Sequence, residues 1–354
     1  MPGGQLPQAG AIHRQPALSE TLKRLAREGR DGFYKGQVAE DMVRHLNALG
    51  GLHSLEDFAM ASGDYVTPIS TNYRGYDVHQ IPPNNQGVTA LMMLNMLEGF
   101  DFAGVGALSA ERLHLEIEAG RLAYDIRNRF IADPTKTAVN IATMLDKGFA
   151  TKQRARISRD RAAGDIAPVA LDKSETVYLT VVDRDRNAVS FINSIYHSFG
   201  SGILAPKSSV VLQNRGMSFR IDPKHPNVIA PGKRPLHTIM PGMVTCGDRC
   251  VMPYGVMGGD YQPFGHVHLL QNILDFGMDP QAALDAARVF ASDGTVEVER
   301  GIDGATRARL VALGHHVIDA QEPLGGGQAI CIDAEHGTLT AGSDPRKDGC
   351  ALGY

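Results

Sequence analysis

The sequence predicts an α+β fold, with helices in the first half of the chain and a strand-rich sheet with late helices in the second. Apolar residues recur at helical spacing up to about residue 130, whereas β-branched runs with strand character begin at Thr176. No Rossmann fingerprint joins alternating strands and helices. With 354 residues, the chain can form one large domain or two ordinary ones. We therefore expect a layered fold and no dinucleotide-binding domain.

The first half is expected to consist of a short tail followed mainly by helices. Apolar residues three and four apart predict a helix that starts near Leu18 and ends at Gly29. The later elements expected here are a helix over 33–49, a short capped helix after Ser54, a strand over 68–78, and helices over 88–97 and 109–130. Residues 152–173 are polar and charged with few apolar anchors, which predicts a mobile linker.

The second half begins with a predicted hairpin. Its strands cover 176–183 and 188–195, with a turn at 185–187. The remaining elements expected are strands near 209–212, 239–244, 251–256, 296–299 and 328–333, and helices over 266–276 and after the Asp279 cap. The four cysteines predict free thiols in a reducing compartment, and the spacing of Cys246 and Cys250 fits a hairpin better than a metal knuckle.

Composition excludes several classes of partner. The net charge is −4 without a basic block, which argues against nucleic acid. Apolar runs are too short to cross a bilayer, and the first residues lack the features of a signal peptide, so we expect a cytoplasmic protein that acts on a small molecule. No metal or cofactor is expected, because His266 and His268 would point to different faces of a helix.

Two features hint at chemistry without establishing it. Gly258 and Gly259 follow a predicted strand and precede a helix, where backbone N–H groups can hold an oxyanion, although a plain tight turn is the simpler interpretation. Thr176 opens a strand directly after the predicted linker, yet most such threonines are ordinary strand residues. No G-x-S-x-G elbow, P-loop or H-E-x-x-H pattern occurs.

Collinear segments from Pro16 to the C-terminus resemble the gamma-glutamyltransferase family. The small-subunit segments are TVYLTVVDRDRNAVSFINSIYHSFGSG (176–202), IAPGKRPLHTIMPGMV (229–244), VMGGDYQPFGH (256–266), LDFGMDPQAALDAARV (274–289) and AGSDPRKDGCALGY (341–354). The segments similar to the second half of the large subunit are LAREGRDGFYKGQVAEDMV, NYRGYDVHQIPP and the helix over 109–134. Five small-subunit motifs in order make a chance match implausible.

The resemblance implies an N-terminal-nucleophile hydrolase with a four-layer αββα sandwich, made as a proenzyme. Self-cleavage would fall between Glu175 and Thr176, and Thr176 would become the nucleophile, with its freed α-amino group (pKa about 8) as base. Ser194 aligns with a threonine that hydrogen-bonds the nucleophile, and Gly258 and Gly259 align with the oxyanion hole. Residues 1–175 would be the C-terminal half of the large subunit with its linker, and 176–354 the small subunit, in one intertwined domain.

The substrate-binding positions depart from the pattern of the family. Tyr196 replaces an asparagine, Arg215 and Ser218 replace the ends of a Gln-x-x-Asp segment, and His237 and Thr238 replace a Ser-Ser pair. The loss of the aspartate removes the partner of a substrate ammonium group. Arg215 adds a planar guanidinium whose N–H donors can bind both oxygens of a carboxylate. These changes resemble the branch of oxamate amidohydrolase and cephalosporin-acylase-like proteins. They imply an amide with an oxamate-like or glutaryl-like acyl group.

Three alternatives stay open on the sequence. The protein could be a true gamma-glutamyltransferase that hydrolyses glutathione, or a truncated, non-catalytic relative, because proenzymes of the family carry a long stretch ahead of the region matching Pro16. Arg215 could also pair with an acid such as Asp222. The partners expected are a small amide and the protein's own two subunits after cleavage, and the sequence leaves a homodimer open.

Overall fold

The structure is a computed structural model that describes residues 6–164, 166 and 176–354. The chain divides into two compact units. The helical unit comprises the described residues up to Tyr65 together with His197–Asn214, and the sheet unit comprises Val66–Tyr196 and Arg215–Tyr354. The helical unit draws on residues from both sides of residue 175, and the expectation of one intertwined domain stays a prediction.

The helical unit contains four helices, namely α1 (Pro16–Glu28), α2 (Asp31–Tyr34), α3 (Gly36–Ala48) and α4 (Leu55–Ala59). The first helix ends at Gly29 as predicted. The single helix predicted over 33–49 is wrong at its start, because Lys35 is extended and Gly36 has φ 62°, which separates α2 from α3. Helix α4 begins with a capping box made by Ser54 and Asp57.

The loop 197–214 packs on these helices without forming the strand expected at 209–212. Only an isolated bridge joins Leu204 to Val211. The buried carboxylate of Asp41 accepts hydrogen bonds from the Lys207 and Ser208 amides at 3.0 and 2.8 Å and from the Ser208 hydroxyl at 2.9 Å. The loop is held by a side chain of α3, so it does not need a strand ladder to satisfy its backbone.

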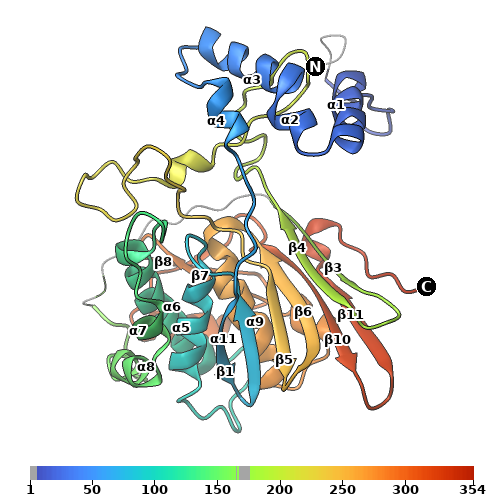
Figure 1. Cartoon of the computed structure of the whole chain (residues 1–354). Coiled ribbons are helices and arrows are strands. Elements are labelled where there is room, and N and C mark those ends of the chain that lie inside the picture. The colour runs from blue at the N-terminus through green and yellow to red at the C-terminus, as the bar shows by residue number, and fades with distance from the viewer. Residues whose placement is uncertain (1–5, 165, 167–175) are drawn as a thin grey trace. The chain divides into compact units, whose positions relative to one another are not determined.

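The sheet unit is built on one six-stranded antiparallel sheet (Figure 1). In spatial order its strands are β1 (Ile69–Tyr73), β2 (Tyr76–Gln80), β5 (Gly242–Cys246), β6 (Arg249–Met257), β10 (Gly326–Asp333) and β11 (Thr338–Ser343). The strand predicted over 68–78 is a hairpin, because Arg74 and Gly75 turn the chain with positive φ. Strands from before and after residue 175 thus share one sheet.

Helices pack on one face of this sheet. They include α5 (Gly87–Leu97) and α9 (Gln262–Leu274), and α6 (Ala110–Phe130) packs against both of these helices. All 11 residues of α5 are buried, which explains why the segment is apolar all round. The other elements are α7 (Ile141–Leu145), α8 (Lys147–Arg154), α10 (Pro280–Asp285), α11 (Gly304–Ala312), and a small sheet of β7 (Val289–Ser292), β8 (Thr295–Val298) and β9 (Val317–Asp319).

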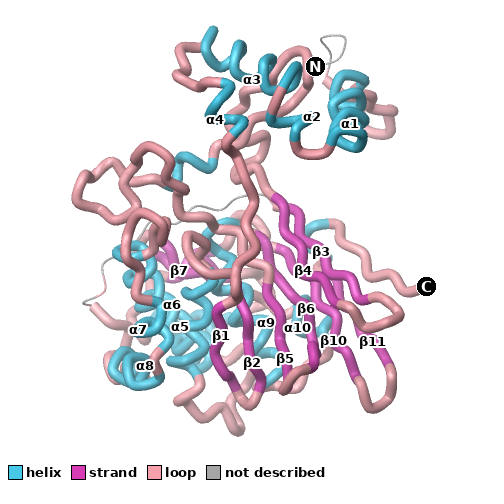
Figure 2. The backbone as a smooth tube through the Cα atoms, viewed as in Figure 1, coloured by secondary structure: helices cyan, strands magenta, loops and turns pink. Residues whose placement is uncertain are grey.

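The predicted hairpin of β3 (Val177–Val182) and β4 (Ala188–Asn193) covers the opposite face of the sheet (Figure 2). Gly255 and Val256 of β6 show the two faces. A Cβ at Gly255 would lie 2.5 Å from the Tyr178 ring of β3, whereas Val256 lies against Gly265 of α9. The structure confirms the α+β class, with helices and a hairpin on opposite sides of the central sheet.

The first part of the predicted linker is packed, so that prediction is wrong up to Gly164. Helix α8 extends to Arg154, and Ile157 is buried. The Ala162 amide donates to the Leu313 carbonyl at 2.6 Å, and the Ala163 amide donates to Glu118 at 2.8 Å. Residues 165 and 167–175 lie outside the described part of the chain. The four cysteines are free, and no described helix is long and apolar enough to span a membrane.

Candidate active site

Thr176 lies immediately before β3, and its side chain meets Ser194 at the end of β4. Val177 and Asn193 form the last pair of the hairpin at its open end. Thr176 precedes Val177 and Ser194 follows Asn193, so the two residues lie opposite each other just beyond this pair. The Thr176 hydroxyl donates to Ser194 Oγ at 3.1 Å, and the Tyr196 amide donates to the same oxygen at 2.9 Å. Ser194 therefore connects Thr176 to the turn that carries Tyr196. The other side of the predicted cleavage site, Glu175, lies outside the described residues.

Tyr196 is buried in a backbone conformation that side chains rarely adopt. Its φ is 80° and its exposure is 2%. Such conformations cost about 1–3 kcal/mol and occur preferentially at functional sites. The Arg215 guanidinium lies over the Tyr196 ring, 5.1 Å from its centroid, and Arg215 Nη1 donates to Thr238 Oγ1 at 3.3 Å. Burial lowers the pKa of Arg215, while Tyr196 acts in the opposite direction.

A small pocket brings three of the five predicted substrate-binding residues together. Tyr196, Ser218 and Thr238 line a cavity of about 80 Å³. Ser218 Oγ is buried and has no hydrogen-bond partner among the described residues. Arg215 does not line the pocket in this structure, but it contacts two residues that do. The alternative partner of Arg215, Asp222, is an exposed residue whose carboxylate accepts from the Lys224 amide.

His237 differs from the other predicted binding residues. Its Nδ1 lies 2.7 Å from the Pro235 carbonyl and 2.7 Å from Asn84 Nδ2, and it does not line the pocket. Burial is the main cause that lowers the pKa of His237 to about 4. The ring is therefore neutral at pH 7, and its observed bonds join the 235–238 segment to the turn before α5.

Gly258 and Gly259 form the turn between β6 and α9, with φ 131° and 61°. The Gly258 carbonyl accepts from the Tyr261 amide at 3.1 Å, and the Gly259 carbonyl accepts from Gln86 Nε2 at 2.9 Å. In a trans peptide the C=O and N–H point in opposite directions, so the N–H groups of Gly259 and Asp260 point away from these partners.

Three buried residues that the sequence did not single out hold this turn against the pocket. Arg127 Nη1 donates to Gln86 Oε1 at 2.6 Å and is paired with Asp260. Gln86 Nε2 also donates to the Thr238 carbonyl at 2.7 Å. Arg127, Thr238 and Asp260 all line the pocket. The link from Gln86 to α6 and to Asp260 depends on contacts between residues far apart in the sequence.

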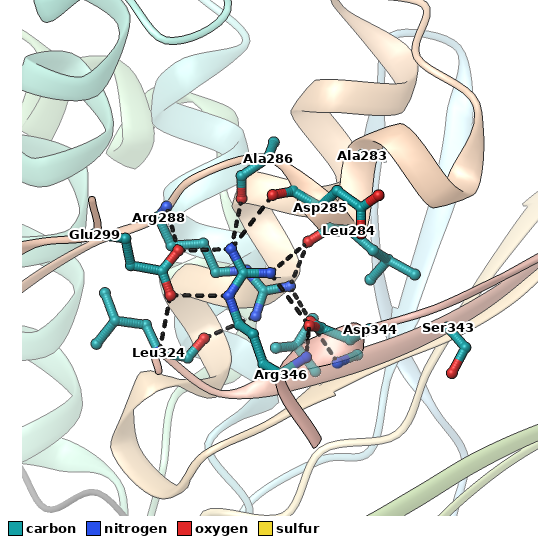
Figure 3. Close-up of polar contacts among 12 residues, drawn as sticks. Ala283, Leu284, Asp285, Ala286, Arg288, Glu299, Leu324, Ser343, Asp344 and Arg346 are labelled. Carbon is teal, nitrogen blue, oxygen red and sulfur yellow. Dashed lines mark hydrogen bonds and ion pairs between the residues drawn. The ribbon is translucent and has the colours of Figure 1, made fainter. Parts of the chain in front are cut away.

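The segment 324–327 packs directly against the glycine turn at Gly258. A Cβ at Gly258 would lie 3.0 Å from Gly325 Cα, so neither position has room for a side chain. Figure 3 shows the ion-pair network that holds this segment. Arg288 Nη1 donates to the Leu324 carbonyl at 2.7 Å, and the Leu324 amide donates to Glu299 at 3.0 Å.

The same network fixes the far end of the segment. Asp344 accepts from the Gly327 amide at 3.0 Å and pairs with Arg288 (Figure 3). Arg346 bridges the two carboxylates, lying 2.6 Å from Glu299 and 3.2 Å from Asp344. The backbone that touches Gly258 is therefore held at both ends by buried or half-buried charges.

His266 and His268 lie on different sides of α9, as their spacing predicts. His266 Nε2 accepts from the Val256 amide at 3.1 Å, whereas His268 Nδ1 contacts Arg112 at 2.8 Å and Glu116 at 3.2 Å. Both histidines are buried, and burial lowers their pKa values to about 3 and about 4. They support the packing of α9 from two different sides.

Comparison with known proteins places the chain in a family. The sequence model of the gamma-glutamyltranspeptidase family matches residues 1–354. The glutathione hydrolase-like YwrD proenzyme of Bacillus subtilis (strain 168) is 37% identical over 99% of this chain and 68% of its own length. The oxamate amidohydrolase proenzyme of Klebsiella pneumoniae is 34% identical over 99% of this chain and 67% of its own length.

A solved structure agrees with these matches. The crystal structure of cephalosporin acylase from Bacillus halodurans superposes with a TM-score of 0.92 at 37% identity, covering 100% of this chain and 66% of that chain. The chain thus spans about two thirds of the length of these three relatives, and its fold is that of N-terminal-nucleophile hydrolases of this type. The chain belongs to the gamma-glutamyltranspeptidase family of amide hydrolases and acylases.

Proposed function

We propose that the protein is a self-processing amidohydrolase in which Thr176 is the nucleophile. The observation that carries the proposal is the hydrogen bond of 3.1 Å from the Thr176 hydroxyl to Ser194 Oγ, because it holds that hydroxyl at the edge of the hairpin beside the turn that leads into the pocket. The relatives named above as proenzymes support processing of the chain.

Processing and catalysis would use the same hydroxyl. The Thr176 oxygen adds to the Glu175 carbonyl, the C–N bond to the Thr176 nitrogen breaks, and water hydrolyses the resulting ester. This leaves a carboxylate at residue 175 and a free α-amino group at Thr176. That amino group then takes the hydroxyl proton as Thr176 attacks a substrate amide. The Gly258–Gly259 turn would stabilise the oxyanion, and one such donor is typically worth about 10²–10³ in rate.

The substrate we propose is an amide whose acyl group carries a carboxylate, oxamate-like or glutaryl-like. Arg215 supports this, because its buried guanidinium contacts Tyr196 and Thr238, both of which line the pocket. The buried Ser218 hydroxyl adds a polar group there without the charge that an ammonium would need. The oxamate amidohydrolase and the cephalosporin acylase to which this chain is similar support the same class of acyl group.

The finer form of the fold belongs to the same proposal. We propose that the mature enzyme is a four-layer αββα sandwich, in which residues 1–175 and 176–354 belong to separate subunits after cleavage. The strands of the large sheet come from both sides of residue 175. Cleavage there would leave the two pieces joined by the hydrogen bonds between β2 and β5.

Ser194→Ala is expected to slow both self-cleavage and amide hydrolysis by about 3- to 10-fold. The variant removes one hydrogen bond to the nucleophile, worth about 0.5–1.5 kcal/mol. Ser194→Thr is the matched control, since it restores a hydroxyl and adds one methyl group, and it should retain most of the rate. The measurement is a time course of cleavage by gel electrophoresis together with kcat on the preferred amide. Equal rates for Ser194→Ala and the native protein would show that Ser194 does not assist the nucleophile.

The proposal on substrates predicts a specific change in selectivity for Arg215→Ala. We expect kcat/KM for glutaryl or oxamate amides to fall about 10- to 100-fold, because a charge-assisted hydrogen bond is worth about 1.5–3 kcal/mol. Arg215→Lys is the control that keeps the charge and loses the planar fork, so it should recover part of the loss.

The assay should use the full product of the gene, including any segment encoded ahead of Met1. A panel of oxamate, glutaryl amides and a γ-glutamyl anilide separates the candidate acyl groups. Efficient turnover of the γ-glutamyl anilide that Arg215→Ala leaves unchanged would contradict the proposed substrate class and favour a glutathione hydrolase.

A further inference from the structure

Three buried side chains away from Thr176 gather into a cluster of metal-ligand type. His114 and Glu118 lie one turn apart on α6, and His315 precedes β9. Their exposures are 0%, 0% and 6%. One nitrogen or oxygen atom from each lies within 4.8 Å of the other two. The pair on α6 could be found by its i, i+4 spacing, but His315 is 201 residues from His114, so the sequence did not reveal the set.

The hydrogen bonds of His114 leave Nδ1 as the atom that faces the cluster. Its Nε2 lies 2.7 Å from the Ser158 carbonyl, which can only accept, so Nε2 carries the proton. The Nδ1 lone pair then faces His315 Nε2, at 2.7 Å. A ligating histidine in proteins almost always donates its other ring N–H to such an acceptor. His114 therefore has the arrangement of a metal ligand held by its outer hydrogen bond.

The carboxylate of Glu118 is held in a similar way. One oxygen accepts from Arg121 Nη1 at 2.7 Å, and the other accepts from the Ala163 amide at 2.8 Å. An ionised carboxylate has about four lone-pair sites, so each oxygen retains one for a further ligand bond. These two donors fix the orientation of the carboxylate toward the histidines, as outer-shell partners do in metal sites.

A cavity lies beside His315, which is the one proposed ligand that lines it. It has a volume of about 170 Å³, and His315, Arg121, Ala163 and Thr295 are among the residues that line it. Zn²⁺ sites of the open type use three protein ligands and leave the fourth position to water, and two histidines with one glutamate are a known set of ligands for them. The cavity has room for such a water and for entry of an ion.

We propose that His114, Glu118 and His315 form a site for a divalent transition-metal ion, with Zn²⁺ the best-matched ion. The ion replaces the proton now shared by the two rings, and that proton moves to Nδ1 of His315 or to solvent. At Zn–N distances of about 2.0 Å, tetrahedral geometry places the two nitrogens roughly 3.3 Å apart, so the rings must separate by roughly 0.6 Å. The bound ion joins α6 to the turn before β9. It does not depend on the role proposed for Thr176.

The site also lies beside the chain that leads toward residue 175. Ser158 and Ala163 each contact a proposed ligand, and Ala162 is bonded to Leu313 close to His315. Occupancy of the site therefore stabilises the segment 157–164 against α6.

The test uses the full chain, freed of metal with a chelator and dialysed against Zn²⁺. We expect one tightly bound Zn²⁺ per chain and a rise in the unfolding temperature on loading. His315→Gln should weaken binding by about 100-fold or more, since even loss of an outer-shell partner typically costs 10–100-fold. His316→Gln is the matched control, because that exposed neighbour is outside the cluster, and it should bind as the native protein does.

Two further measurements keep the proposal testable if His315→Gln does not fold. Glu118→Gln is nearly isosteric and should also weaken Zn²⁺ binding, and Co²⁺ bound to the native protein should show the strong visible absorption of four-coordinate geometry. The proposal is overturned if the native protein binds no Zn²⁺ in preference to Mg²⁺. It is equally overturned if both cluster variants bind Zn²⁺ as well as His316→Gln does, which would leave a hydrogen-bonded histidine pair.

Discussion

Thr176→Ala is expected to leave the protein uncut and to lower amide hydrolysis by on the order of 10⁶-fold, as loss of a covalent nucleophile does in other hydrolases. The substitution removes the only atom that the proposal uses for attack in both steps. The fold should persist, because Thr176 is half-buried and lies outside the β3–β4 ladder. The measurements are intact-mass spectrometry and kcat on a glutaryl or oxamate amide.

Two controls separate chemistry from folding in this experiment. Thr180→Ala changes the same residue type within β3, four residues along the chain, and should be processed normally. Thr176→Ser keeps a hydroxyl and should still be cleaved, more slowly. If Thr176→Ala were processed and active like Thr180→Ala, another residue would have to be the nucleophile.

Arg288→Met is expected to lower the free energy of unfolding by about 3 kcal/mol, near the lower end of the usual cost of breaking a buried ion pair. Arg288 and Asp344 are 1% and 0% exposed, and the guanidinium also bonds the Leu324 and Leu284 carbonyls (Figure 3). Removing it leaves a buried carboxylate with fewer partners. The loss is moderated because Arg346 remains 3.2 Å from Asp344.

A matched substitution at an exposed ion pair gives the baseline for this value. Arg129→Met breaks the pair with Asp125, whose side chains are 62% and 30% exposed, and should cost no more than about 1 kcal/mol. Urea unfolding followed by circular dichroism measures both changes. Equal destabilisation by the two variants would show that the buried network contributes nothing beyond a surface pair.

The local features of this fold were the ones that the sequence predicted well. The hairpin that brings Thr176 opposite Ser194 follows from strand alternation and a short turn, and the caps at Ser54 and Asp279 follow from side chains within three residues. The β1–β2 hairpin was missed because Arg74, a residue that rarely has positive φ, occupies half of its turn.

The rest of the candidate site depends on contacts between distant segments. Gln86, Arg127 and Asp260 come from three parts of the chain, and each is an ordinary polar residue until packing buries it beside the others. The same reason explains the predicted linker, in which Ile157 is buried and three backbone groups find partners on α6 and beside α11. Polar composition indicated exposure there, but the tertiary fold satisfied the backbone instead.

The position of the new N-terminus in the processed protein tests the central claim most directly. The purified full product of the gene would be separated into its fragments, and the C-terminal fragment would be sequenced from its N-terminus. The account predicts a fragment of residues 176–354 that begins Thr-Val-Tyr-Leu with a free amino group. A fragment that begins at any other residue, or a product that stays as a single uncut chain, would contradict the assignment of Thr176 as a self-released nucleophile.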